Sequence, residues 1–150
     1  MIKKNIKFSI AIDGSSASGK TTGSKIISKK FKFKLLPSGK LYLSSIKEDK
    51  VIQIFKNIKT PKTAKNTITD ISQFKKEIKR ILNQGYAFDD EEWFNGMVGI
   101  SLPITNFKNE LCFCLSTHTA KSRKNIDDLK KIYPSMLSAA KNLKKALFKD

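Results

Sequence analysis

Arginine, cysteine and long apolar runs are scarce in this chain of 150 residues, and each scarcity limits what the protein can do. Among its 30 basic residues only Arg80 and Arg123 are arginine, and the lysines are scattered along the whole sequence. Base readout and paired phosphate contacts favour arginine, so the net charge of +17 indicates a lysine-rich composition rather than a nucleic-acid surface. No apolar run is long enough to cross a bilayer, and no signal-peptide cleavage site follows the basic N-terminus. We therefore expect a cytoplasmic protein that does not associate with membranes.

The cysteines form one close pair, Cys112 and Cys114, in the stretch ELCFCLST. A zinc site needs four ligands with characteristic spacing, and the single histidine of the chain, His118, does not complete one. A spacing of two in a β-rich segment places both side chains on one face of a strand. We expect two small buried thiols at these positions.

The stretch GSSASGKT matches the phosphate-loop pattern G-x-x-x-x-G-K-T, and it lies between a predicted strand, Ile6–Ile12, and a predicted helix, Thr21–Phe31. Its two glycines allow successive backbone N–H groups to surround a phosphate, and the N-terminus of the following helix attracts the same anion. Lys20 would reach the β- and γ-phosphates of ATP, and the Thr21 hydroxyl would hold Mg²⁺. The predicted nucleotide-binding residues are Gly14, Ser15, Ser16, Ala17, Ser18, Gly19, Lys20 and Thr21.

Residues 2–42, which include IAIDGSSASGKTTGSKIISKKFKFKLLPSGKLY, resemble the N-terminus of bacterial cytidylate kinases. The resemblance implies binding of ATP and Mg²⁺, with CMP or dCMP as the phosphoryl acceptor. The acceptor-site and lid arginines of these kinases, a Mg²⁺-binding aspartate and the remaining parallel strands have no counterpart after residue 42. Phosphoryl transfer depends on positioning and on neutralising negative charge. We therefore expect residues 1–38 to be a truncated phosphate-loop unit without kinase activity.

Residues 39–150 have a different pattern, in which helices surround an antiparallel hairpin. Helical spacing predicts helices over SGKLYLSS, over EDKVIQIFKNI, and from Thr69 or Asp70 to a stop at Gly85. GYAFDDEE predicts a short strand that enters an acidic turn, and VGISLPIT and ELCFCLST predict two paired strands. A final helix over NIDDLKKIYPSMLSAAKNLKKALF is capped by Asn125 and is kinked or broken by Pro134. These elements indicate an α+β domain whose antiparallel sheet is covered on one face. The apolar stripe predicted for the third of these helices is Ile71, Phe74, Ile78, Ile81 and Leu82.

Residues 38–148 resemble the C-terminal effector-binding domain of transcription regulators of the isocitrate lyase regulator (IclR) family. The motifs NTITD and GYAFDDEE, a glycine a few residues later, and a strand pair followed by a terminal helix carry the resemblance. It implies a GAF-like fold that binds a small organic acid or aromatic metabolite, needs no cofactor, and forms homodimers or higher homo-oligomers. The first strands of that domain have no counterpart, because the phosphate-loop unit occupies their place.

This second resemblance assigns effector binding to Asp89, Gly99, Ser116 and His118. Ser116 and His118 are two residues apart and share one strand face, and a hydroxyl beside an imidazole suits a carboxylate or carbonyl ligand. Gly99 departs from the family, which often has cysteine or another polar side chain there. Each polar position also has a purely structural interpretation: Asp89 as a solvated turn acid, Ser116 as an ordinary strand serine, and His118 as an edge residue beside a loop.

Our main hypothesis is a chimera whose two parts, residues 1–38 and 39–150, join within KLLPSGKLYLSS, where the two resemblances overlap. Metabolite sensing is then the main activity, and we expect no direct DNA binding because nothing in the sequence resembles a helix-turn-helix. Two alternatives stay open. One is a nucleoside monophosphate kinase that transfers phosphate from ATP to CMP or dCMP. The other is nonspecific nucleic-acid binding through the net charge, which predicts steep salt dependence.

The kinase alternative makes the first testable prediction. Because the acceptor site and lid are missing, we expect no turnover in a coupled assay that supplies ATP, Mg²⁺ and CMP. Turnover that the substitution Lys20→Ala abolishes would contradict this expectation and would make the chain an enzyme.

Overall fold

The computed structural model describes residues 36–57 and 61–148, which all belong to one compact unit, Phe33–Asp150. The predicted strand Ile6–Ile12, the phosphate loop and the helix after it lie outside the described residues, and they stay predictions. Among the described helices, none is long and apolar enough to span a membrane.

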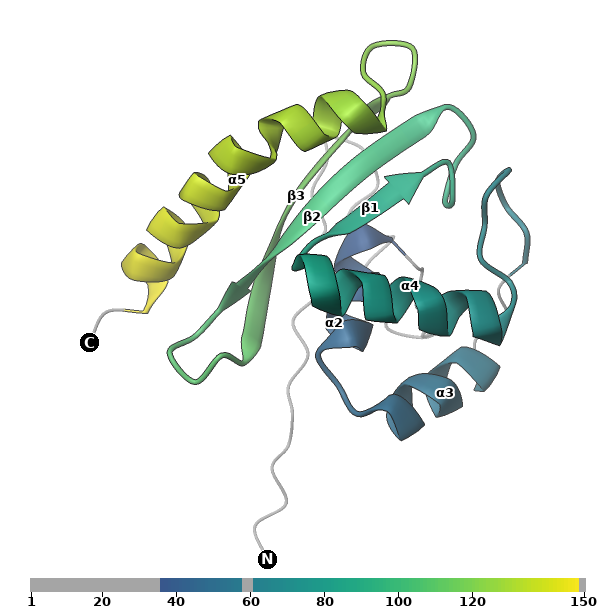
Figure 1. The fold of residues 1–150 in the computed structure, drawn as a ribbon, viewed down its shortest axis with the longest axis horizontal. Helices are drawn as coiled ribbons and strands as arrows, with labels where there is room; N and C mark the ends of the chain where they lie inside the picture. The colour runs from purple at the N-terminus through teal and green to yellow at the C-terminus, as the bar shows by residue number, and fades with distance from the viewer. Residues whose placement is uncertain (1–35, 58–60, 149–150) are drawn as a thin grey trace, which may run out of the picture. The chain divides into compact units, whose positions relative to one another are not determined.

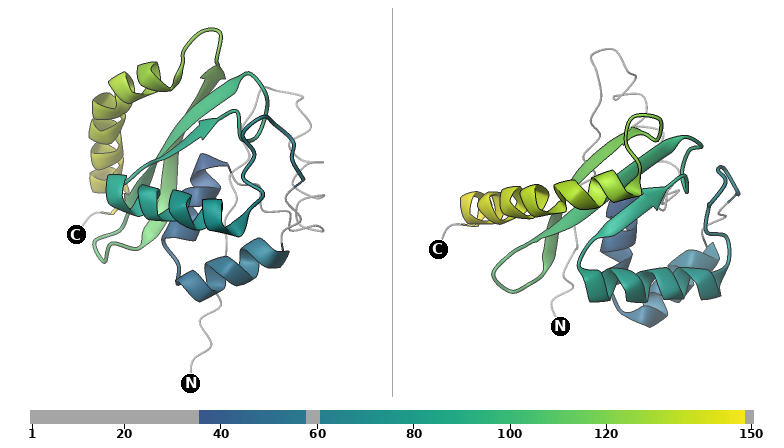
Figure 2. Two further views of the ribbon diagram at one scale, coloured as in Figure 1. Left: turned by 45° about the vertical axis from the view of Figure 1, so that its right-hand side comes forward. Right: turned by 45° about the horizontal axis from the view of Figure 1, so that its top comes forward.

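Three antiparallel strands form one sheet in the order β1-β2-β3, and helices lie against both of its faces (Figure 1). The strands are β1 (Ala87–Asp90), β2 (Met97–Thr105) and β3 (Leu111–Ala120). The helices are α2 (Pro37–Ser44), α3 (Glu48–Asn57), α4 (Ile71–Gln84) and α5 (Ile126–Leu147). Figure 2 shows α5 along one face of the sheet and the group of α2, α3 and α4 on the other side. The predicted α+β class with an antiparallel sheet is therefore confirmed, although helices cover two faces rather than one.

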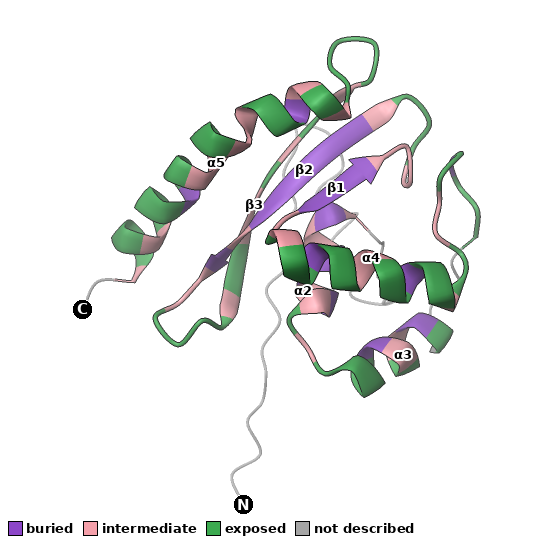
Figure 3. Cartoon of the chain, in the orientation of Figure 1, coloured by how far each residue is buried: buried purple, intermediate pink, exposed green. Residues whose placement is uncertain are grey.

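The central strand β2 is buried on both faces (Figure 3), and its alternation determines which residues face α5. Val98, Ile100 and Leu102 point to the α5 side and pack with Phe88 of β1 and Leu129 of α5 in one apolar cluster. Burying an apolar side chain of this size stabilises a fold by about 1.5–3 kcal/mol. The residues of β2 between them point to the opposite face, toward α2.

The helix α2 occupies the stretch in which the two family resemblances overlap. Pro37 stands in its first turn, where the missing N–H is no loss and the fixed φ suits a helix. Leu41 packs with Ile81 of α4 and Ala87 of β1, and this cluster attaches α2 to the sheet. The stretch therefore forms the helix that was predicted over SGKLYLSS.

The helix α4 begins and ends at the predicted residues. Asp70 is its cap, and its carboxylate accepts hydrogen bonds from the N–H groups of Ser72 (2.9 Å) and Gln73 (3.0 Å). Gly85 ends it in the left-handed conformation, at φ 79°. The predicted apolar stripe is wrong at one position, since Leu82 is 62% exposed. Because Leu82 directly follows the buried Ile81 in the helix, the side chain of Leu82 points away from the core.

A second apolar cluster joins α2, α3 and α4. Leu43, Val51, Phe55 and Phe74 are buried together in it, and the rings of Phe55 and Phe74 stack with their centroids 4.6 Å apart. This cluster fixes α3 against α4 and, through Leu43, holds both helices to α2.

The helix α5 is continuous from Ile126 to Leu147, so Pro134 does not break it. Its N-terminus has a complete capping box, in which Asn125 and Asp128 each accept a hydrogen bond from the backbone N–H of the other. The capping prediction for Asn125 is therefore confirmed.

The prediction of two buried thiols is wrong for Cys112, which is exposed. The register between β2 and β3 shifts at Ile104/Thr105, so that Cys112 falls at the irregularity and has no residue opposite it. Cys114 is half-buried, and burial raises the pKa of its thiol to about 11. Both thiols are free.

The stacked pair in the second cluster gives a stability prediction. We expect Phe74→Ala to lower the free energy of unfolding by about 3–5 kcal/mol, because Phe74 is fully buried and its removal leaves a cavity. Leu82→Ala, on the same helix, is the matched control and should change it by no more than about 0.5 kcal/mol. Urea denaturation measures both values, and equal losses in the two variants would contradict this packing.

Candidate functional site

The sheet face opposite α5 carries all four predicted effector-binding residues. Asp89 pairs with Gly99, and Gly99 pairs with His118, so that these three residues form one row across the sheet. Ser116 belongs to the neighbouring row, where it pairs with Ser101. Since side chains in a strand alternate between faces, the two rows point to the same side. The structure therefore brings the predicted residues together on one polar face, called the polar face below.

The imidazole of His118 lies over Gly99. A methyl group at Gly99 would have its carbon 2.3 Å from His118 Cδ2 and 2.7 Å from Nε2, which is closer than carbon and ring atoms approach. Gly99 is buried while His118 is exposed, so the ring covers the glycine and keeps one side toward solvent. The absence of a side chain at position 99 is what allows the imidazole to lie against the sheet.

Ser101 is a member of the polar face that sequence reasoning missed. Its side chain is fully buried, and its hydroxyl shares a hydrogen bond of 2.5 Å with the hydroxyl of the exposed Ser116. The signal was in the sequence, because Ser101 follows Gly99 by two residues and so shares its strand face. Ser116 is the half of this pair that a ligand could reach.

Asp89 is neither solvated nor free. Its side chain is 1% exposed, and its carboxylate accepts a hydrogen bond of 2.8 Å from the N–H of Glu92 and a longer one, 3.4 Å, from that of Trp93. These bonds fold the acidic turn back onto the end of β1. The interpretation of Asp89 as a solvated turn acid is therefore wrong, and its main contacts are structural.

A buried lysine connects α2 to this turn. Lys40 is fully buried, and its Nζ lies 2.9 Å from Glu77 Oε1 of α4 and 2.7 Å from Glu92 Oε1 of the turn. A buried ammonium needs such partners, because an ammonium buried without one destabilises the fold by on the order of several kcal/mol. Sequence reasoning missed this group, because nothing distinguishes Lys40 from the other lysines except its apolar neighbours.

The carboxylates around Lys40 have opposite pKa shifts. Burial raises the pKa of Glu92 to about 7; Lys40 opposes the increase, whereas Glu77 and Asp89 add to it. For Glu77, burial also acts to raise the pKa, but the hydrogen bond and charge of Arg80 together with Lys40 outweigh it and lower the pKa below the ordinary value. Glu92 is thus the member of the cluster that takes up a proton near neutral pH.

A hollow of about 180 Å³ lies at another place, between the ends of α2 and α4 and the β2–β3 hairpin. Its walls are mainly apolar, and it includes none of the four predicted residues. It is smaller than the roughly 300–1,000 Å³ that is usual for small-molecule sites. Within the described part of the chain no cluster of histidine, cysteine and carboxylate side chains could hold a metal ion.

The sequence profile of a family described as "Bacterial transcriptional regulator IclR C-terminal" matches residues 20–145, and the match begins inside the predicted phosphate loop. No curated protein matches the sequence.

Solved structures have the same fold. The inducer-binding domain of a PobR transcription factor double mutant from Acinetobacter, in complex with 3-hydroxybenzoic acid, is 21% identical, with a TM-score of 0.69 over 72% of this chain and 62% of that one. The C-terminal domain of the E. coli regulator KdgR is 26% identical, with a TM-score of 0.61 over 70% and 63%. The IclR of Thermotoga maritima is 22% identical, with a TM-score of 0.66 over 75% and 45%. The chain therefore spans between 45% and 63% of the length of these relatives.

The contact between Gly99 and His118 gives a prediction. In Gly99→Ala the new methyl group should push the imidazole off the sheet, because the two cannot occupy the same space. Nuclear Overhauser contacts between the His118 ring and the backbone of residue 99 should be present in the wild type and lost in the variant. Ser101→Ala, which adds no volume to the same strand, is the control and should keep them. Unchanged contacts in Gly99→Ala would contradict the geometry.

The raised pKa of Glu92 predicts a pH dependence of stability. Between the ordinary value of 4.5 and about 7 the folded protein keeps a proton that the unfolded chain has lost. The native state then binds more protons, so this group makes stability fall as pH rises through that window and adds no further change above it. In Glu92→Gln that part of the decline should disappear, whereas the exposed Asp49→Asn should retain it. Urea denaturation at several pH values measures the curves, and parallel curves for wild type and Glu92→Gln would refute the assignment.

Proposed function

This chain belongs to the IclR C-terminal family of bacterial transcriptional regulators, and we propose that residues 39–150 are an effector-binding domain that senses a small organic acid through its polar face. The observation that carries the proposal is the convergence of Gly99, Ser116 and His118 in two neighbouring rows of one sheet face. Binding sites combine a few converging polar groups with apolar surroundings. Here the exposed imidazole and hydroxyl are the groups that a ligand can meet.

The chemistry of these groups fits a carboxylate or a carbonyl. The Ser116 hydroxyl can donate to an anionic oxygen, because its bond to Ser101 can be made with either serine as donor. The imidazole of His118 can donate a second hydrogen bond and offers a flat surface to an aromatic ring. The complex of the PobR domain with 3-hydroxybenzoic acid supports a small aromatic acid as the first compound to test.

Asp89 takes a different role in this proposal from the other three residues. Its hydrogen bonds to the turn N–H groups hold Glu92 in reach of Lys40, and Lys40 comes from the helix that lies against the polar face. Asp89 therefore shapes the site, and replacing it would disturb the turn as well as any ligand. His118 and Ser116 are the better positions for a test of direct contact.

We expect the protein to bind at least one member of a panel of small organic acids that includes 3-hydroxybenzoate, as measured by thermal shift and then by calorimetry. His118→Ala and Ser116→Ala should each weaken that binding by about tenfold, which corresponds to the loss of one good hydrogen bond. Thr117→Ala is the matched control, because it lies between them on β3 and points to the other face. Binding that is equal in all three variants, or a panel without any ligand, would contradict the proposal.

The remaining expectations are independent of this test. Assembly into homodimers or higher oligomers is a proposal that rests on the family alone. The predicted binding of ATP and Mg²⁺ by Gly14–Thr21 rests on the sequence motif alone, and a binding titration with ATP and Mg²⁺ that compares the wild type with Lys20→Ala tests it.

A further inference from the structure

The outer edge of β3 has no strand beside it within the described part of the chain. β3 is ten residues long and is the last strand in the sheet order β1-β2-β3 (Figure 1). No residue of β3 is buried, in contrast to the central strand β2. The edge of a strand presents a row of backbone N–H and C=O groups with which another strand can pair. The edge of β3 is therefore a surface for strand pairing.

The register with β2 identifies the backbone groups that this edge presents. The N–H of Lys121 donates a hydrogen bond of 2.7 Å to the carbonyl of Gly96, in register with the paired strands. Opposed residues of antiparallel strands alternate between pairs that exchange hydrogen bonds and pairs that do not. From this bond onward, the alternation turns the N–H and C=O groups of Cys114, Ser116 and His118 away from β2. Within residues 36–57 and 61–148, no hydrogen bond reaches these groups.

The opposite edge of the sheet is protected, whereas the edge of β3 is not. β1 has four residues, and it includes Asp89 and Asp90. The side-chain amide of Asn66 donates a hydrogen bond of 2.7 Å to the carbonyl of Asp90. Short length, charge and covering groups are means by which proteins prevent strand edges from associating. β3 is long, it contains no lysine, arginine, carboxylate or proline, and its register shift is confined to its beginning.

An antiparallel copy of β3 fits this edge. With Ser116 opposite Ser116 of the second copy, Cys114 lies opposite His118 of that copy. Each of the free backbone groups then has a partner, because such pairs exchange two hydrogen bonds. The pairing lies in the plane of the sheet, and side chains point out of that plane. The contact therefore uses neither the Ser116 hydroxyl nor the His118 imidazole.

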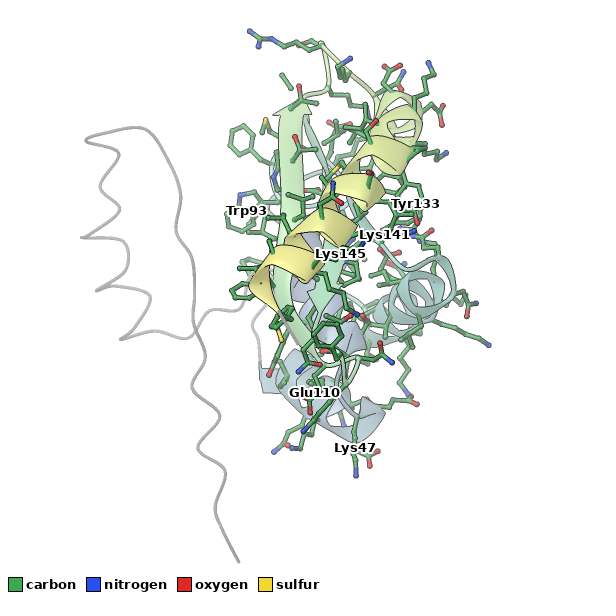
Figure 4. All side chains as sticks on the ribbon, turned by 90° about the vertical axis from the view of Figure 1, so that its left-hand side faces the viewer. Lys47, Trp93, Glu110, Tyr133, Lys141 and Lys145 are labelled. Carbon is green, nitrogen blue, oxygen red and sulfur yellow. The ribbon has the colours of Figure 1, made fainter. Side chains whose placement is uncertain are left out.

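β3 also allows two copies of a strongly basic chain to meet without opposed charges. The net charge is +17, and α3, α4 and α5 all carry exposed lysines. A symmetric contact through one of these helices would place like charges together. β3 has no charged residue, and just beyond its end Lys121 already pairs with Asp90 at 2.9 Å. The antiparallel arrangement brings the exposed Glu110, which Figure 4 shows at the end of the molecule where β3 begins, toward Arg123 of the second copy.

We propose that two copies of the chain pair through the outer edges of β3 and form one continuous antiparallel sheet. The two-fold axis passes through the sheet at Ser116, so both α5 helices lie on one face and both polar faces lie on the other. The family resemblance leads to an expectation of oligomers but names no contact between the copies. The free edge of β3 supplies that contact, and it does not depend on which ligand the polar face binds.

Sedimentation equilibrium of the full chain over a series of concentrations tests the proposal, and the wild type should show a monomer–dimer equilibrium. Ser116→Pro removes the outward N–H at the axis and no hydrogen bond to β2. It should raise the dissociation constant of the dimer at least about tenfold. Ser116→Ala is the matched control, because it removes the same hydroxyl and keeps the N–H. It should leave the dissociation constant within about twofold. Circular dichroism verifies that both variants are folded.

Amide hydrogen exchange on the wild type tests the same contact without any substitution, and it decides the matter if Ser116→Pro does not fold. The N–H groups of Ser116 and His118 should exchange slowly at concentrations that favour the dimer and rapidly after dilution. The N–H of Thr117, which faces β2, is the internal control and should be protected at both concentrations.

Several outcomes would overturn the proposal. One is a monomer at every concentration of the series. Another is a dimer that Ser116→Pro leaves intact, which would place the contact on a different surface. Equal losses in Ser116→Pro and Ser116→Ala would mean that the hydroxyl, rather than the strand edge, holds the copies together. Protection of Ser116 and His118 that does not change with concentration would identify a strand of the same chain as the occupant of the edge.

Discussion

The two-sided burial of β2 is the constraint on which the rest of the domain depends. A central strand has neighbours on both edges and layers on both faces, so each of its residues must suit one of two different environments. On one side Val98, Ile100 and Leu102 form the apolar surface that holds α5. On the other side Gly99 and Ser101 are small, and this leaves room for the side chains of β3 and for α2. A shift of the register by one residue would exchange the two faces and destroy both.

Buried charge sets the position of the helix that lies on the polar face. Lys40 has to stay close to Glu77 and Glu92, because separating them would leave charges unpaired in the interior. The three residues come from α2, from α4 and from the turn after β1, so the cluster links the parts that surround the polar face. A bulky apolar pair could join these elements with more stability. The ionic cluster adds a group, Glu92, whose proton occupancy changes near neutral pH.

Sequence patterns predicted most of the fold and part of the site. Alternation predicted the hairpin. The residue types at the helix ends predicted the caps Asp70 and Asn125 and the stop at Gly85, because local backbone chemistry determines these features. The predictions of burial were wrong at Leu82 and Cys112. The exposure of Leu82 depends on which neighbours pack against α4, and that of Cys112 depends on the shift of register between β2 and β3. The Lys40 cluster joins residues 37 and 52 positions apart in the chain, and no local pattern reports such a distance. Asp89 lies in one row with Gly99 and His118, but its hydrogen bonds to the turn could not be predicted from the motif alone.

Mapping a bound ligand on the protein tests most directly whether the polar face binds a small acid. With 3-hydroxybenzoate, or the best acid from the panel, the amide NMR signals of Gly99, Ser101, Ser116 and His118 should move together in proportion to occupancy. Signals of α5 and of the hollow beside Leu82 and Leu111 should stay in place. Shifts confined to that hollow or to α5, with the polar face unchanged, would contradict the account.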